Sequence, residues 1–121
     1  MHYRTLGKSN LQVSALCLGT MMFGDQTGQD EAAAIVADAC AHGVNYIDTA
    51  DVYTKGASET MLGSLLKGQR HEWVLATKLG NKMSDRVNES HYSRSWMLRE
   101  LDNRLQRLQT DWIDLYQLHW P

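Results

Sequence analysis

Residues 44–51 read VNYIDTAD, a short apolar run with strand-favouring residues that ends abruptly in polar ones. The alanine-rich stretch EAAAIVADACAH, residues 31–42, precedes it and predicts a helix that Gly43 ends. A second, shorter helix is expected to begin at Ser58, which Glu59 follows, and to end at Gly68. A buried strand between two helices is the repeating unit of an α/β fold with parallel strands.

The same alternation extends to both sides of this unit. It predicts a hairpin within residues 3–13, strands at residues 15–19, 72–78 and 111–119, and a long helix at residues 93–109. Strands separated by helices run parallel and are joined by right-handed crossovers. Four such strands fit either a small open doubly wound sheet or the first half of an eight-stranded β/α barrel, and periodicity does not choose between them.

The long helix is expected to bury its leucine side. Leucines recur at spacings of three and four, at Leu98, Leu101, Leu105 and Leu108. Four charged residues are assigned to the opposite, polar face: Arg99, Glu100, Arg104 and Arg107. By helical periodicity, the leucines should therefore face the sheet and the charges should face solvent.

Composition excludes several classes of protein. The 121 residues suit one domain, and 12 Lys and Arg against 14 Asp and Glu give a formal charge of -2, which argues against nucleic-acid or anionic-membrane partners. No apolar run reaches the length of a membrane span and the N-terminus lacks a signal-peptide core, so a cytoplasmic protein is expected. Cys17 and Cys40 form no CxxC motif and are expected to be two buried thiols, without a disulfide or a bound metal.

Polar residues end successive predicted strands. Asp48 follows the second strand, Lys78 ends the third, His119 ends the fourth, and Tyr53 lies in the loop beyond Asp48. Taken singly, these are a turn residue, a solvated lysine, a core-edge histidine and a loop aromatic. Their shared place at the carboxyl end of a parallel sheet, where ligands bind, favours an active site, whereas Asp51 is expected to be solvated.

Four segments carry a resemblance to a known family. They are LGTMMFG at 18–24, YIDTADVYTKGASE at 46–59, VLATKLG at 74–80 and LQTDWIDLYQLHWP at 108–121. In order and spacing they resemble the aldo-keto reductases. The resemblance implies the first half of a parallel β/α (TIM) barrel of that family's type, as one partial domain over residues 1–121. Residues 1–14 would form its hairpin, and residues 15–121 its first four strands and three helices.

The resemblance also implies an NADPH-dependent oxidoreductase that reduces an aldehyde or ketone, with Asp48, Tyr53, Lys78 and His119 as its catalytic residues. Tyr53 would give a proton to the developing alkoxide, Lys78 would favour the resulting phenolate, Asp48 would hold Lys78, and His119 would bind the carbonyl oxygen. The implied cofactor-binding residues are Gly19, Thr20, Met21 and Asp48. The implied substrate-binding residues are Phe23, Tyr53, His119 and Trp120; Phe23 has a core position as its alternative, and Trp120 simple packing.

The chain departs from the family in two respects. Family members carry four further strands, whose loops grip most of the cofactor, and many relatives have glycine where this chain has Thr54. A half barrel would leave the strands at residues 15–19 and 112–119 as open edges. Three hypotheses follow: a partial reductase that binds cofactor poorly alone, a homodimer joined through the open barrel edges, or a non-catalytic interaction module with the same fold.

Overall fold

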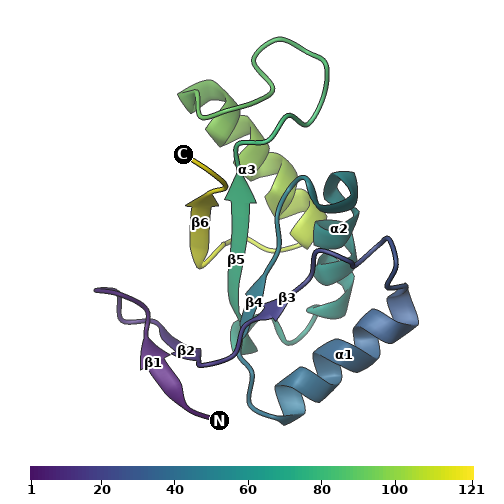
Figure 1. Cartoon of the computed structure of the whole chain (residues 1–121), viewed down its shortest axis with the longest axis vertical. Coiled ribbons are helices and arrows are strands. Elements are labelled where there is room, and N and C mark those ends of the chain that lie inside the picture. The colour runs from purple at the N-terminus through teal and green to yellow at the C-terminus, as the bar shows by residue number, and fades with distance from the viewer.

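Four parallel strands form the sheet of this computed structural model, which describes residues 1–121 (Figure 1). They are β3 (Leu18–Gly19), β4 (Tyr46–Asp48), β5 (Val74–Leu79) and β6 (Leu115–Leu118). The spatial order β3-β4-β5-β6 follows the chain without reversal. A doubly wound sheet reverses its strand order at a switch point, so this order confirms the half barrel over the open sheet.

The edge strands are shorter than the sequence predicts. The predicted strands at residues 15–19 and 111–119 contract to Leu18–Gly19 and Leu115–Leu118, because each has a hydrogen-bonded neighbour on one side only. Side chains beside these edges remain uncovered, with Leu16 63% and Leu118 59% exposed.

A two-stranded hairpin lies at the amino-terminal ends of the sheet strands (Figure 1). It pairs β1 (Tyr3–Thr5) with β2 (Gln12–Ser14) in antiparallel register. The Asn45 side chain, directly before β4, accepts from Ser14 N at 2.7 Å and donates to Gln12 O at 2.9 Å. One amide thus fixes the hairpin to the sheet and leaves the carboxyl ends of the strands free.

Three helices cover one side of the sheet, and the other side is bare (Figure 1). They are α1 (Gln29–Ala41), α2 (Ala57–Leu65) and α3 (Arg94–Leu108), with short 3-10 turns η1 (Tyr53–Gly56) and η2 (Arg70–Glu72) between them. Ser93 caps α3 by accepting from Trp96 N at 3.3 Å. The expected start of α2 is wrong: its cap is Gly56, and Ser58 is buried inside the helix. None of the helices combines the length and apolar character needed to cross a bilayer.

The hydrophobic core fills the space between the helices and the covered face of the sheet. Its largest apolar members are Phe23, Ile47, Leu62, Leu66, Trp73, Leu75 and Leu108. The prediction of two buried thiols is wrong, because Cys17 is exposed and Cys40 is only partly buried. Cys17 precedes the short edge strand β3, where no neighbouring strand covers it.

Helix α3 buries much of the charged face predicted to be in solvent and leaves much of its leucine face exposed or only partly buried. The residues it buries are Trp96, Glu100, Arg104 and Leu108. Leu98 is 49% exposed, and Leu101 and Leu105 are only partly buried. The charged side of α3 can be buried here because the loop after β4 and helix α2 supply carboxylates that pair with its arginines. The prediction from helical periodicity rests instead on the preference of charged residues for solvent.

Candidate active site

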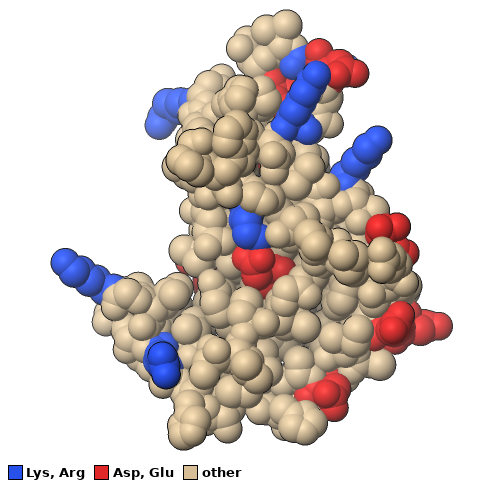
Figure 2. Space-filling model, in the orientation of Figure 1, with Lys and Arg blue, Asp and Glu red and all other residues tan.

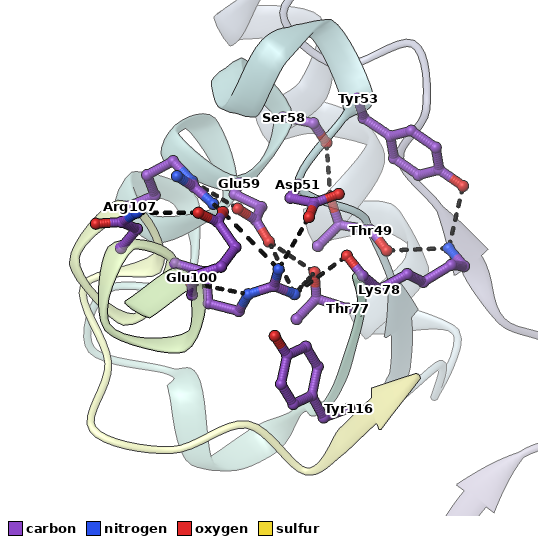
Figure 3. A network of polar contacts seen from close by, with 12 residues as sticks. Thr49, Asp51, Tyr53, Ser58, Glu59, Thr77, Lys78, Glu100, Arg107 and Tyr116 are labelled. Atoms are coloured by element: carbon purple, nitrogen blue, oxygen red, sulfur yellow. Dashed lines mark hydrogen bonds and ion pairs between the residues drawn. The ribbon is translucent and has the colours of Figure 1, made fainter. Parts of the chain in front are cut away.

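The side chain of Lys78 joins two other predicted site residues, Asp48 and Tyr53, at the carboxyl end of the sheet. Figure 3 shows its contacts with Tyr53 and with the carbonyl of Thr49. Its Nζ donates to Asp48 Oδ2 at 2.5 Å, to the Tyr53 hydroxyl at 3.0 Å and to the carbonyl of Thr49 at 3.0 Å. Asp48 ends β4 and Lys78 lies near the end of β5; these strands are parallel neighbours, with Asp48 opposite Ala76. Because the two strands are adjacent and parallel, the Asp48 carboxylate and the Lys78 ammonium lie at the same end of the sheet.

A strained turn places Tyr53. After this residue, Thr54 and Lys55 adopt left-handed backbone with φ of 48° and 54°, and Gly56 has φ of 90°. Left-handed backbone is rare for a β-branched residue such as threonine, and it marks a segment that its surroundings hold in place. Thr54 thus carries a glycine-like conformation despite its β-branched side chain.

The surroundings of Lys78 keep its ammonium charged. Burial lowers the pKa of Lys78, but its hydrogen bonds to Asp48 and Tyr53 act in the opposite direction and leave that pKa above its ordinary value. Its side chain is 16% exposed and that of Asp48 is 24% exposed. A fixed cation therefore lies against the phenol oxygen, on a face that solvent can reach.

His119 lies beside Tyr53, just beyond the end of β6. The two rings meet edge to face with centroids 6.0 Å apart. Burial, followed by the charge of Lys78, lowers the pKa of the imidazole, so His119 is neutral near pH 7. Its Nδ1 lies 3.0 Å from the side-chain nitrogen of Asn81. Sequence reasoning missed Asn81, although its place in the loop directly after β5 puts it at the same end of the sheet.

The remaining predicted site residues divide into open and buried positions. A Cβ built on Gly19 would meet nothing within 4 Å, and Met21 and Trp120 are 55% and 46% exposed. Thr20 is buried, and its hydroxyl contacts Asp48 O and Ser58 Oγ at 3.0 Å each. The substrate-binding expectation for Phe23 needs correction: its ring is 3% exposed and belongs to the hydrophobic core.

Behind β5 lies a second charged group, which we call the buried ion cluster: Asp51, Glu59, Glu100, Arg104 and Arg107. Arg104 donates to Asp51 Oδ2 at 3.1 Å, to Thr77 Oγ1 at 3.2 Å and to the carbonyl of Lys78 at 3.2 Å. Arg107 pairs with Glu59 Oε2 at 2.6 Å and also with Glu100. Figure 3 shows this cluster on one side of the view and the Tyr53–Lys78 contact on the other.

The expectation that Asp51 is solvated is wrong. Asp51 is fully buried, and burial raises the pKa of its carboxyl to about 6, although the Arg104 guanidinium acts to lower it. Nothing near Asp51 in the sequence signals this, since its ion partner lies 53 residues away on α3.

The candidate site is an open face of the molecule. The three hollows of the surface lie elsewhere, and the largest is lined by residues of α2 and its neighbours, among them Thr60, Ser64 and Arg107. On the face drawn in Figure 2, most charged side chains project at the margins, and one adjoining pair of opposite charges lies near the middle.

Comparison with known proteins agrees with the strand order. Residues 15–121 match the aldo/keto reductase family. The chain belongs to this family. Its relatives include the uncharacterized oxidoreductase YqkF of Bacillus subtilis, 41% identical over 98% of this chain and 39% of the relative. Protein tas of Escherichia coli K12 is 38% identical over 100% of this chain and 39% of its own length.

Solved structures of aldo-keto reductases share the fold. The holo form of aldo-keto reductase AKR11C1 from Bacillus halodurans superposes with a TM-score of 0.85 and 41% identity, over 98% of this chain and 40% of that structure. The chain therefore has the fold of the first part of an aldo-keto reductase TIM barrel. It spans about two fifths of the length of the curated relatives it matches.

Proposed function

We propose that the protein reduces an aldehyde or ketone to an alcohol, with NADPH as reductant and with Asp48, Tyr53, Lys78 and His119 as its catalytic residues. The observation that carries this proposal is the placement of Lys78 Nζ, 2.5 Å from the Asp48 carboxylate and 3.0 Å from the Tyr53 hydroxyl. A fixed ammonium beside a phenol oxygen can stabilise the negative charge that develops there as the phenol transfers its proton to a substrate.

Each side chain has a distinct task in this chemistry. Lys78 donates to the Tyr53 oxygen, so the phenol proton is free to bond the carbonyl oxygen of a substrate. As negative charge develops on that oxygen, Tyr53 gives up its proton and the Lys78 ammonium stabilises the phenolate left behind. Asp48 keeps Lys78 charged and in place, and His119 offers a ring N–H that orients the carbonyl.

The open strand ends fit a flat cofactor ring. Gly19 leaves free space at the end of β3, and Asp48 Oδ1 makes no hydrogen bond within the chain and is free to accept one. Gly19, Met21 and Asp48 would lie against the cofactor, while Thr20 would hold the end of β3 to β4 through its hydrogen bond to Asp48 O. When bound, the nicotinamide supplies a hydride to the carbonyl carbon.

The proposal is tested by assaying Tyr53→Phe beside a matched control, Tyr3→Phe, which removes a hydroxyl of the distant hairpin that donates to Gly43 O. NADPH oxidation is followed with a panel of aldehydes and ketones, and NADPH affinity by cofactor fluorescence. Tyr53→Phe should lower kcat by on the order of 10²- to 10⁴-fold. NADPH affinity should not change, and Tyr3→Phe should keep full turnover.

Equal turnover in Tyr53→Phe and in the unaltered protein would overturn the proposed role of Tyr53. NADPH binding without turnover of any carbonyl compound by the unaltered protein would contradict the reductase proposal.

A further inference from the structure

We infer that Asn81 is a positioning residue that fixes the tautomer of His119, with the ring proton on Nε2. The inference deepens the proposed function and rests on it, because the task of His119 is to donate to a carbonyl oxygen. The observation is the contact of 3.0 Å between Asn81 Nδ2 and His119 Nδ1.

The hydrogen-bonding groups determine the direction of this contact. An amide NH₂ can only donate, so the ring nitrogen facing it must accept and cannot carry a hydrogen. A neutral imidazole has one N–H, and that proton must then lie on Nε2. Asn81 is the only side chain that hydrogen-bonds the ring, so Nε2 is free to donate to a bound molecule.

The ring stays neutral because of the groups around it. The titratable side chains that face His119 are Tyr53, whose ring touches it edge to face, and the Lys78–Asp48 pair. Burial and Lys78 lower the pKa of His119, and Asp48 opposes them more weakly. A neutral ring is the state in which the choice of tautomer matters, because an imidazolium donates from both nitrogens.

The backbone brings Asn81 and His119 together in register. In the parallel pair β5–β6, Leu79 lies opposite Leu118, and His119 N donates to Leu79 O at 2.8 Å. Asn81 is two residues beyond Leu79, and its amide reaches across to the ring from the adjacent strand end.

Tyr92 holds both strand ends in this arrangement. Its hydroxyl accepts from Trp120 N at 3.2 Å and donates to Trp120 O, the residue after His119. The same hydroxyl fills the space beside Gly80, where a Cβ would approach it to 2.3 Å. Gly80 has φ of 134°, a conformation open to glycine, and it leads directly into Asn81. The amide and the imidazole are therefore both anchored, as a fixed tautomer requires.

The tautomer matters because a carbonyl oxygen only accepts hydrogen bonds. With the proton on Nε2, His119 donates to that oxygen and supports the charge that develops on it. With the proton on Nδ1, an imidazole lone pair would face the same oxygen and repel it. Asn81 acts through His119 and does not touch the reacting atoms.

The test reads the ring nitrogens directly, in long-range ¹H–¹⁵N spectra of protein labelled with ¹⁵N-histidine near neutral pH. His119→Gln identifies the resonances of His119 among those of the five histidines. Asn81→Leu removes the donor, and Asn81→Asp replaces it with an acceptor. Lys82→Leu is the matched control, because Lys82 neighbours Asn81 but pairs only with Asp85, at 2.8 Å.

The unaltered protein and Lys82→Leu should both show a protonated Nε2 and a bare, hydrogen-bonded Nδ1. Asn81→Leu should give a mixture of tautomers, and Asn81→Asp should move the proton to Nδ1 and raise the pKa of the ring. A bare Nε2 in the unaltered protein, or an unchanged tautomer in Asn81→Leu, would overturn the inference.

The spectra and the enzyme assay separate this inference from the proposed function. If turnover is found, Asn81→Asp should lower kcat/KM by on the order of 10²-fold, the cost of one lost donor to a developing oxyanion. If the protein turns over no carbonyl compound yet the tautomers change as expected, the reductase proposal fails and the Asn81–His119 relation stands. If turnover is found and the tautomer does not respond to Asn81, the positioning inference fails alone.

Discussion

Two charged groups of similar chemistry lie on opposite faces of β5. One group is the pair of Lys78 and Asp48, which solvent reaches: the Lys78 side chain is 16% exposed and that of Asp48 is 24% exposed. Thr77, the preceding residue, contacts the buried ion cluster, in which the side chains of Arg104, Asp51 and Glu59 are 0% exposed. Adjacent residues of a strand point to opposite faces, so a single step along β5 separates a site that solvent reaches from an interior of fixed charges.

The comparison teaches that exposure decides what a charge can do. The Lys78 ammonium can contact water or a bound molecule, whereas the charges of the buried ion cluster pair with one another and hold secondary-structure elements together. Two arginines face three carboxylates in the buried ion cluster, and Asp51 Oδ1 is buried with no hydrogen-bond partner. Arg104 joins the loop that carries Asp51 to the carbonyl of Lys78, so the buried ion cluster supports the backbone on which the candidate site rests.

The largest effect should come from breaking the buried side. Arg104→Met leaves three buried carboxyl groups without their central cation and should lower the free energy of unfolding by about 3–5 kcal/mol. Urea unfolding provides the measurement. Arg99→Met on the same helix is the control: Arg99 is 53% exposed, and its loss should cost less than about 1 kcal/mol. Equal losses in both variants would contradict the contrast between faces.

The pH dependence of Asp51 sharpens the comparison. With a pKa of about 6 in the folded protein against 3.8 without burial, Asp51 binds its proton more tightly in the folded state. Between these values the folded state holds more protons, so this group stabilises folding more as pH falls from 7 to 4. The difference in unfolding free energy between the unaltered protein and Asp51→Asn should shift by about 2 kcal/mol in favour of the unaltered protein. A constant difference across that range would refute the shift.

Breaking the open side should affect stability much less. In Lys78→Met, Asp48 can regain water because its side chain is 24% exposed, so the loss should be about 1 kcal/mol. The measurement is the same urea unfolding, beside Arg104→Met. If Lys78→Met lowered the free energy of unfolding as much as Arg104→Met, the difference in exposure between the Lys78–Asp48 pair and the buried ion cluster would not determine their contributions to stability.

The smallest effect is expected on the leucine side of α3. Leu98→Ala, at a side chain 49% exposed, should change the free energy of unfolding by less than about 0.5 kcal/mol. Leu108→Ala is the matched variant at 3% exposure and should cost about 2–5 kcal/mol. If both substitutions lowered the free energy of unfolding by similar amounts, Leu98 would be buried as helical periodicity predicts, and the observed orientation of α3 would be contradicted.

Local signals predict the element order well, and they fail where distant residues meet. The VNYIDTAD strand, the alanine-rich helix and the long final helix all occur, with ends within a few residues of those expected. Asp48, Lys78 and Tyr53 come together as expected because parallel strands bring their carboxyl ends to one edge. Phe23, Asp51 and the faces of α3 are misplaced, because their burial depends on partners contributed by other elements.

The sequence by itself determined the alternation of strands and helices, the end of the sheet that carries reactive side chains, and the family. These follow from local propensity, short periodic patterns and motif spacing, all of which can be read from the order of residues in the sequence. Only the tertiary structure decided which face of α3 is buried, that Asp51 carries a buried charge, and that Asn81 reaches His119. The physical reason is that a charge or a polar ring takes its environment from residues far away in sequence, and only folding brings those residues within a few ångströms.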